Sequence, residues 1–413
     1  CTRNNKKNND QRPNILFIMS DDHAYQAISA YNDKLIQTPN IDRIAKEGML
    51  FTNASVTNSI CAPSRAVILT GKHSHINGKI DNLSPFDTTN VTFPQLLKKA
   101  GYTTAMFGKL HFGNNPKGFD EFKILPGQGD YYNPRFITQK GDTTITGYVT
   151  DITTDLTLDW MTKRRDTTKP FLLMYLHKAP HRSWLPAERH YKTFTQKTFP
   201  LPESLFDDYA TRTATSKPAE MNILDHMLLR YDLKVSNETL KDLNLKERLG
   251  MGGVRRLNPI QKSSWDAIYN PINEAFKENY PQMNDSTLMV WKYQRYMQDY
   301  LGTIASVDDN VGRLMNYLDE EKLSENTMIV SETNTKGIIV YANNDFCEIA
   351  GYTKTELIGK PHNYVRHEDM PKAAFEDLWK TIKSGKVWKG IVKNITKKTA
   401  KVYVNELKKK KFF

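Results

Sequence analysis

Three short apolar runs, each followed by polar side chains, constrain the fold of this chain more than any other feature. They are residues 14–20, 101–107 and 169–176. Each has the length of a strand, and continuous apolar runs are typical of strands buried on both faces of a parallel sheet. Because open α/β sheets bind ligands at the carboxyl ends of their strands, the polar residues after these runs are candidate site residues.

Two adjacent carboxylates, Asp21 and Asp22, follow the first run. Neighbouring carboxylates repel each other unless a cation joins them, and carboxylate oxygens suit a hard divalent metal ion. The alternative is a solvated turn, which is the commoner role of an isolated pair of aspartates.

Lysine and histidine side chains follow the other two runs. Lys109 and His111 come after the second run, and residues two apart in a strand point to the same side, so both can face one pocket. His181 follows the third run, with His177 as a weaker candidate. Lysine and histidine at strand ends are also common surface residues, so alone they do not indicate a site.

The segment 61–71 combines a cysteine, a proline, a serine and an arginine with a run that predicts a helix. Pro63 suits the first helical turn, because its missing N–H would have had no partner there. The free N–H groups and the positive dipole end of the helix face whatever Cys61 faces, and Arg65 adds a forked cation suited to oxyanions. The segment predicts a modified or nucleophilic Cys61 in an anion-binding corner, or alternatively a buried free cysteine.

The pattern Cys61-x-Pro63-Ser64-Arg65 resembles the signature of the type I sulfatases. This resemblance implies that a maturation enzyme oxidises Cys61 to formylglycine, whose hydrate is the nucleophile. It also implies one calcium ion.

The other polar residues match the family's site position by position. The calcium ligands implied are Asp21, Asp22 and Cys61. The residues implied in sulfate binding and catalysis are Cys61, Arg65, Lys109, His111 and His181, of which His181 protonates the leaving alcohol.

The sulfatase resemblance covers residues 12–330 and implies an α/β fold like that of the sulfatases and alkaline phosphatases, with a mostly parallel sheet flanked by helices. Residues 265–271 and 291–296 resemble bacterial sulfatases that act on 6-sulfated N-acetylglucosamine in host glycans. Three tryptophans are expected in an apolar pocket wall or in ordinary core: Trp184, Trp265 and Trp291.

The resemblance breaks after Val330. Apolar residues from Tyr300 to Leu318 recur at spacings of three and four, which predicts a helix, and residues 323–330 begin another strand. In sulfatases that strand leads to two further calcium ligands, a lysine and a C-terminal subdomain, which do not follow here. Since calcium takes about six to eight oxygen ligands, we expect much of the calcium affinity to be lost.

Residues 331–404 resemble an incomplete PAS domain, a small α+β sensor module, of the aerotaxis-receptor type. The resemblance implies a candidate FAD site, and the positions tied to flavin binding are Arg366, His367, Asp369 and Trp388. Many PAS domains bind no cofactor. Residues 405–413 form a basic tail, read either as an artificial end or as a weak membrane-binding segment.

The net charge of +12 does not indicate a nucleic-acid-binding protein. Residues 386–413 hold ten lysines and one glutamate, which is +9 of this charge, so the remainder is close to neutral and offers no basic face. Three widely spaced cysteines imply no disulfide framework, and we find no apolar run long enough to span a bilayer.

The polar leader of residues 1–11 begins with Cys1, which is typical of a mature bacterial lipoprotein. A lipid on Cys1 would be the membrane attachment and would place the protein in the periplasm or at the cell surface. A working PAS domain would instead indicate the cytoplasm.

Three functions follow as hypotheses. The first is a sulfuric ester hydrolase acting on sulfated carbohydrate, with activity in doubt because the family's C-terminal part is missing. The second is a PAS sensory protein that binds FAD. The third is a non-functional chimeric gene product.

Overall fold

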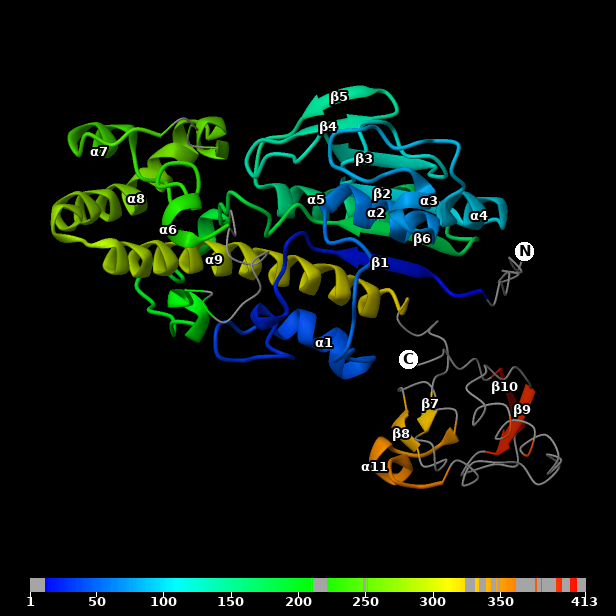
Figure 1. Ribbon diagram of the computed structural model, residues 1–413. Coiled ribbons are helices and arrows are strands. Elements are labelled where there is room, and N and C mark those ends of the chain that lie inside the picture. Colours follow the sequence, from blue (N-terminus) through cyan, green and yellow to red (C-terminus); the bar gives the residue numbers. More distant parts are fainter. Residues whose placement is uncertain are drawn as a thin grey trace. The chain divides into compact units, whose positions relative to one another are not determined.

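The computed structural model divides the chain into two compact units, one of Cys1–Arg43 with Leu50–Glu320 and one of Ile44–Met49 with Glu321–Phe413 (Figure 1). The structure describes residues 12–208, 210, 221–247, 250, 252–323, 331–333, 339–342, 347, 350–361, 376, 380, 391–395 and 402–406. The polar leader 1–11 lies outside the described residues. No described helix combines the length and apolar character that crossing a membrane requires.

A six-stranded sheet in the order β1-β6-β2-β3-β4-β5 forms the centre of the first unit. Its strands are β1 (Ile15–Met19), β6 (Phe171–Leu176), β2 (Thr103–Lys109), β3 (Glu121–Leu125), β4 (Arg135–Thr138) and β5 (Gly141–Thr144). The first four are parallel, and β4 and β5 are antiparallel additions at one edge. The predicted mostly parallel sheet is therefore confirmed.

Strand burial explains why these apolar runs form the sheet centre. Every residue of β6 is buried, because β1 and β2 flank it and helices cover its faces. All five residues of β1 are only half-buried, and within the described residues β1 pairs with β6 alone. β1 is thus an edge strand made of apolar side chains.

Helices cover both faces of the sheet. On one face α2 (Cys61–Thr70) and α4 (Phe93–Lys99) pack on a core that includes Met106, Leu172 and Met174. On the other face α5 (Val149–Asp159) lies against β2 and β6, and α9 (Asp285–Glu320) packs on α5. The other described α-helices of this unit are α3 (Ser74–Asn77), α6 (Ile223–His226), α7 (Asn237–Asp242) and α8 (Pro259–Asn279), and α1 (Pro39–Glu47) has residues in both units.

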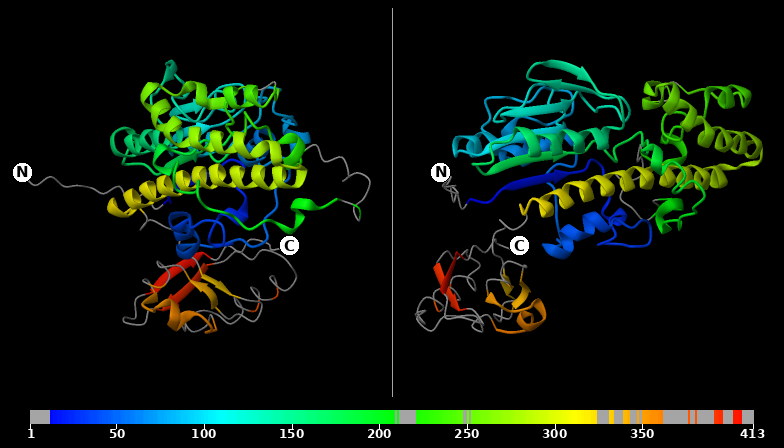
Figure 2. Two further views of the ribbon diagram at one scale, coloured as in Figure 1. Left: turned by 90° about the vertical axis from the view of Figure 1, so that its left-hand side faces the viewer. Right: turned by 180° about the vertical axis from the view of Figure 1, so that it is seen from behind.

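The chain between β6 and α9 builds a helical region beside one end of the sheet, where α6 packs against α9 and α7 packs against α8 (Figures 1 and 2). Helix α9 contains the helix predicted from Tyr300 to Leu318, which is confirmed, and extends it back to Asp285. Trp265 is buried in the main core, whereas Trp184 and Trp291 are half-buried and make tilted ring contacts with Tyr296 and Phe276 respectively.

The second unit contains two antiparallel strand pairs and a short helix. β7 (Ser331–Thr333) pairs with β8 (Ile339–Ala342), and β9 (Ile391–Ile395) pairs with β10 (Val402–Glu406). Helix α11 (Lys354–Leu357) is capped by Thr353 and packs with Ala342 and Ala350. β10 extends two residues into the segment predicted as tail. The predicted flavin residues Arg366, His367, Asp369 and Trp388 lie outside the described residues.

Candidate active site

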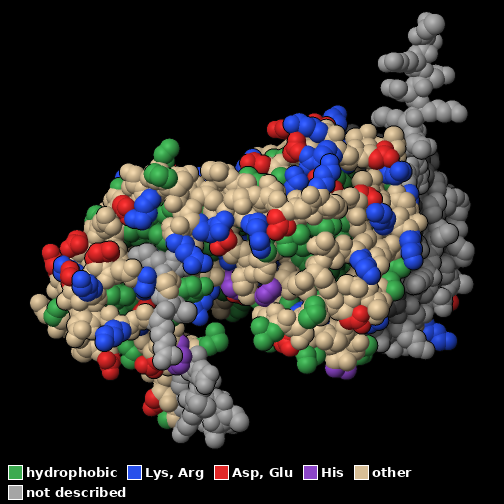
Figure 3. All heavy atoms as spheres, turned by 90° about the horizontal axis from the view of Figure 1, so that it is seen from above, with side chains coloured by type: hydrophobic (Ala, Val, Ile, Leu, Met, Phe, Trp, Pro, Cys, Tyr) green, Lys and Arg blue, Asp and Glu red, His purple; other side chains and the backbone are tan. Residues whose placement is uncertain are grey.

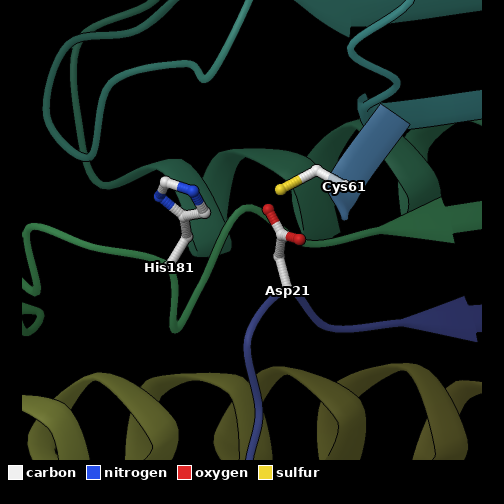
Figure 4. Close-up of side chains that lie close together, drawn as sticks. All are labelled: Asp21, Cys61 and His181. Atoms are coloured by element: carbon white, nitrogen blue, oxygen red, sulfur yellow. The ribbon is translucent and has the colours of Figure 1, made fainter. Parts of the chain in front are cut away.

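The carboxyl ends of the adjacent strands β1, β6 and β2 meet the N-terminus of α2. Asp21 follows β1, Lys109 is the last residue of β2, and Cys61 is the first residue of α2. In Figure 4 the side chains of Asp21, Cys61 and His181 point toward one another. One ligand atom from each of these three lies within 4.8 Å of the others. Residues far apart in the sequence thus converge where the strand order predicts a site.

Asp21 binds two cations beneath Cys61. Lys109 Nζ forms an ion pair with Asp21, and Arg65 Nη2 lies 3.5 Å from Asp21 Oδ1. All three side chains are buried. Burial by itself would raise the pKa of Asp21, but the charges of Lys109 and Arg65 outweigh burial and hold the pKa below its usual value. Asp21 is therefore an ionised group at neutral pH.

Arg65 has donor capacity left over. Its Nη1 donates to the carbonyl of Lys109, while the buried Nε has no hydrogen-bond partner among the described residues. Two buried cations share the carboxylate of Asp21 here, so that carboxylate alone does not neutralise both Lys109 and Arg65. A buried cation with an unused donor is costly unless an anion completes it, which is the property of an oxyanion site.

Cys61 lies half-buried at the start of α2, after Ile60 in extended conformation. α2 ends at Thr70 and Gly71 adopts the left-handed conformation, so the predicted helix is confirmed. Burial raises the pKa of the Cys61 thiol above its ordinary value. A cysteine nucleophile needs a lowered pKa, because the thiolate is the reactive form. The raised pKa keeps the Cys61 side chain as the neutral thiol at pH 7.

His181 is held in one tautomer. Its Nδ1 lies 2.5 Å from the carbonyl oxygen of Arg182, and since a carbonyl only accepts, Nδ1 carries the proton. Nε2 lies 3.6 Å from Asp22 Oδ2. Burial and then the charges of Lys109 and Lys178 lower the pKa of His181 to about 3, so the ring is neutral at pH 7 while the site is empty.

Asp22 and His111 lie at the margins of this cluster. Asp22 adopts φ 61° and is half-exposed, and burial together with the charge of Asp21 raises its pKa. His111 has φ 64° and follows the end of β2, so the strand alternation used to pair it with Lys109 does not reach it. Burial, followed by the charge of Lys109, lowers the pKa of His111 to about 4.

Sequence reasoning missed three residues of the site. Gln128 accepts a hydrogen bond from Lys109, Tyr131 donates its hydroxyl to the carbonyl of His181 at 2.5 Å, and Lys178 Nζ lies 4.7 Å from the centre of the Tyr131 ring. Burial lowers the pKa of Lys178 to about 7. Lys178 could have been found, because it lies three residues before His181 in the sequence. Gln128 and Tyr131 come from loops whose local sequence gives no sign of a role in the site.

The surface above the sheet is hollowed between the helical region and the strands, and Figure 3 shows histidine side chains exposed at this hollow with lysine and arginine side chains nearby. A small anionic ligand arriving from solvent would meet positive charge there.

The residues present fit part of a calcium site. Asp21 and Asp22 supply carboxylate oxygens side by side, and burial, followed by the charge of Asp21, raises the pKa of Asp22. Two carboxylates offer at most about four oxygens, whereas calcium takes about six to eight. Lys109 and Arg65 already engage Asp21. The described residues therefore provide an incomplete ligand set.

Taken together, the sheet and the cationic corner define an α/β protein with an oxyanion site at the carboxyl ends of its strands. Residues 13–331 match the family described as sulfatase, and the chain belongs to that family. Members of this family generally use formylglycine and calcium. Residues 339–406 match the family described as PAS fold.

Three relatives define the likeness more closely. An N-acetylglucosamine-6-O-sulfatase of Bacteroides thetaiotaomicron is 45% identical over 332 residues, which are 79% of this chain and 58% of that protein. A solved complex of a protein with its substrate D-glucosamine-2-N,6-O-disulfate is also 45% identical, with a TM-score of 0.71 over 78% of this chain and 64% of that chain. The aerotaxis receptor of Escherichia coli is 53% identical over 72 residues, which are 17% of this chain and 14% of the receptor.

The chain spans 58% of the sulfatase relative's length and 64% of the solved chain. In this chain the sulfatase match ends at residue 331 and the PAS match begins at residue 339. The boundaries predicted at residues 330, 331 and 404 remain predictions.

Proposed function

We propose that the first unit is a sulfuric ester hydrolase that acts on sulfated carbohydrate, with 6-sulfated N-acetylglucosamine in host glycans as its substrate. The observation that carries the proposal is the buried pair of Arg65 and Lys109 with an unused Arg65 donor, set beneath Cys61 at the N-terminus of α2. The substrate follows from the names of the two sulfatase-like relatives, which act on 6-sulfated glucosamine derivatives.

Each residue then has a role in ester hydrolysis. Arg65 and Lys109 bind the sulfate oxygens and offset the charge that develops on them. Formylglycine made from Cys61 would supply, as its hydrate, the oxygen that attacks sulfur. As the sulfur–oxygen bond of the ester breaks, His181 Nε2 gives a proton to the leaving alcohol. His111 is the second histidine of the sulfate pocket.

The low pKa of His181 limits this role in the empty site, because a general acid must carry its proton. A bound sulfate ester adds a negative charge beside the same cations that lower this pKa. Substrate binding therefore raises the pKa of His181, and the ring takes up at Nε2 the proton that it later gives to the leaving alcohol. Asp21 and Asp22, with position 61, would hold calcium, which supplies additional positive charge to the sulfate when bound.

We expect weak calcium binding and low activity, because the described residues provide an incomplete ligand set. Hydrolysis by the whole relatives is not evidence for the activity of this chain, which spans 58% of the sulfatase relative's length. Calcium in the millimolar range would be needed to occupy such a site.

The first test is mass spectrometry of the peptide that contains Cys61, from protein made in a host with a formylglycine-generating maturation enzyme. Conversion of –CH₂SH to –CHO lowers the mass by about 18 Da. The second test is sulfate release from 6-sulfated N-acetylglucosamine with added calcium, with Cys61→Ala as the inactive control. An unmodified Cys61 and no release above the control would refute the proposal.

A second candidate function belongs to the PAS region, favoured by its 53% identity to part of the aerotaxis receptor. We propose that this region is a sensor module that binds FAD through Arg366, His367, Asp369 and Trp388. The purified protein would then be yellow, with a flavin absorption spectrum that Trp388→Ala abolishes. A colourless protein after reconstitution with FAD would exclude this candidate.

The proposal for location is an extracytoplasmic lipoprotein with lipid on Cys1, which suits an enzyme acting on host glycans. Metabolic labelling with a fatty acid, lost in Cys1→Ser, would support it. Cytoplasmic recovery of an unlabelled protein would favour the sensor candidate instead.

A further inference from the structure

The loop that carries His181 is held by its own neighbours and by a distant segment. The His181 backbone N–H donates to the carbonyl of Lys178 at 3.1 Å, and Tyr131 donates to the His181 carbonyl at 2.5 Å. The ring itself is oriented by the hydrogen bond from Nδ1 to the carbonyl of Arg182, while Nε2 lies 3.6 Å from Asp22 Oδ2. The direction of the imidazole therefore depends on where the Arg182 backbone lies.

The Arg182 side chain is fixed by a two-pronged ion pair. Its Nε and Nη2 donate to the two carboxylate oxygens of Asp232, each at 2.6 Å, and its guanidinium lies 5.3 Å from the centre of the Tyr231 ring. A bidentate pair restrains the guanidinium in direction as well as in distance. Arg182 is thus held by two consecutive residues that lie between α6 and α7.

Asp232 is buried and fixed within the segment between α6 and α7. Its side chain is 1% exposed, and one of its oxygens also accepts from the backbone N–H of Leu228 at 2.8 Å. Arg182 is by contrast 44% exposed. The carboxylate is the fixed partner, and the arginine is the group that it positions.

We propose that Asp232 is a positioning residue for His181, because the Arg182–Asp232 pair fixes the carbonyl that keeps the proton on Nδ1 and leaves Nε2 facing Asp22. The inference rests on the proposed function and deepens it. It assigns the helical region between β6 and α9 a part in the proton transfer.

Nitrogen-15 NMR of the histidine rings at pH 7 tests this without any need for activity. In the unaltered protein, the ring nitrogens of His181, assigned by their absence in His181→Gln, should show a protonated Nδ1 and an unprotonated Nε2. In Asp232→Asn the two shifts should move toward the averaged values of a mixture of tautomers. Arg182→Lys keeps the charge but removes the fork, and since Arg182 is half-exposed this variant can serve if Asp232→Asn does not fold.

The matched control is Asp308→Asn. Asp308 is also a buried carboxylate that accepts backbone N–H groups, those of Asn40 and Ile41, and it makes none of the contacts described for the His181 loop. The control should leave the His181 signals unchanged. Unaltered His181 shifts in Asp232→Asn and Arg182→Lys, or the same change in Asp308→Asn, would overturn the proposal.

Kinetics add a second measurement where sulfate release is detected. Misplacement of Nε2 should lower kcat about 10- to 100-fold in Asp232→Asn and Arg182→Lys, with KM changed by less than about 2-fold. A fall in substrate affinity with unchanged kcat would assign Arg182 to substrate binding and overturn the positioning role. Absence of sulfate release in the unaltered protein would count against the proposed function alone, because the tautomer measurement is independent of it.

Discussion

The Arg65 side chain has a buried fork whose Nε and Nη2 have no hydrogen-bond partner among the described residues, so its shape matters as well as its charge. The residues that the motif 61–65 identified do meet Asp21 and Lys109 in the structure. This juxtaposition was predictable because the motif is local and because parallel strands end at one edge of a sheet. The partners Gln128 and Tyr131 were not predictable, since each contact joins segments that only the tertiary fold brings together.

Replacing Arg65 by lysine keeps the positive charge but loses the forked donors. We expect the rate of sulfate release to fall about 100-fold, the range seen for removal of one oxyanion donor. Arg43→Lys, on a half-exposed arginine outside the site, is the control and should leave the rate unchanged. An Arg65→Lys protein that folds and keeps its rate would show that charge alone suffices.

At the scale of elements, the contact between β2 and β6 places Lys109. Gly108 adopts φ 107°, and a Cβ at this position would lie 1.8 Å from the carbonyl oxygen of Leu176. Only glycine permits this approach, and it ends the regular strand just where Lys109 turns into the site. Period-two reasoning on residues 109 and 111 failed for the same reason, since the strand stops at Lys109 and His111 takes a positive φ.

Gly108→Ala should therefore lower the free energy of unfolding by at least ~3 kcal/mol, because backbone must move to admit the methyl group. Gly141→Ala is matched in backbone, with φ 113°, but its Cβ would meet no atom within 4 Å. The control Gly141→Ala should lower the free energy of unfolding by only about 1 kcal/mol, because alanine is strained at a positive φ. Urea unfolding of both variants measures the difference, and equal costs would mean that the β2–β6 contact is not tight.

Asp309 of helix α9 contacts the segment Glu188–His190. Its Oδ2 lies 2.7 Å from both Arg189 Nε and His190 Nε2. Burial by itself would raise the pKa of Asp309, but its hydrogen bonds to His190 and Arg189 lower it below the usual value. A carboxyl whose pKa is lowered on folding stabilises the folded state above its unfolded pKa. This stability is lost as the pH falls through the folded pKa.

Asp309→Asn should reduce the free energy of unfolding by up to ~1 kcal/mol at pH 7, discounted because Asp309 is 40% exposed. The difference from the unaltered protein should shrink below about pH 4, where Asp309 is protonated in the unfolded chain. Urea titrations at pH 7, 5 and 3 measure it. A difference in the free energy of unfolding that stays constant down to pH 3 would contradict the ion-pair explanation. The control is Asp266→Asn, within α8, which should lower the free energy of unfolding by only a few tenths of a kcal/mol.

At the scale of the whole molecule, the chain carries two units with separate cores. β6 and its neighbours build the first, and Ala342, Ala350 and Leu357 belong to the second. The sequence indicated both units, because the family resemblance changes near residue 330. Only the part of α9 from Tyr300 onward was predicted, although Tyr293 and Met297 of the earlier part enter the same apolar cluster as Tyr300, Leu301 and Ile304.

Calorimetry should resolve two unfolding transitions that respond to different substitutions. Leu173→Ala, in the fully buried strand β6, should shift the first-unit transition by about 2–5 kcal/mol and leave the other unchanged. Leu357→Ala should shift only the second-unit transition. A single transition that both substitutions shift equally would mean that the two units unfold as one.

The pairing of β1 with β6 also means that β1 has to wait for its partner strand during synthesis. β1 leaves the ribosome first, Cys61 follows, and β6 comes roughly a hundred residues after Cys61. At about 5–20 residues per second, this gives an interval of about 5–20 seconds. During this interval Asp21 has no neighbouring strand and Cys61 is not yet enclosed. If an enzyme modifies Cys61, we expect its access to be easiest in those seconds, so that slower translation between residues 61 and 176 raises the modified fraction.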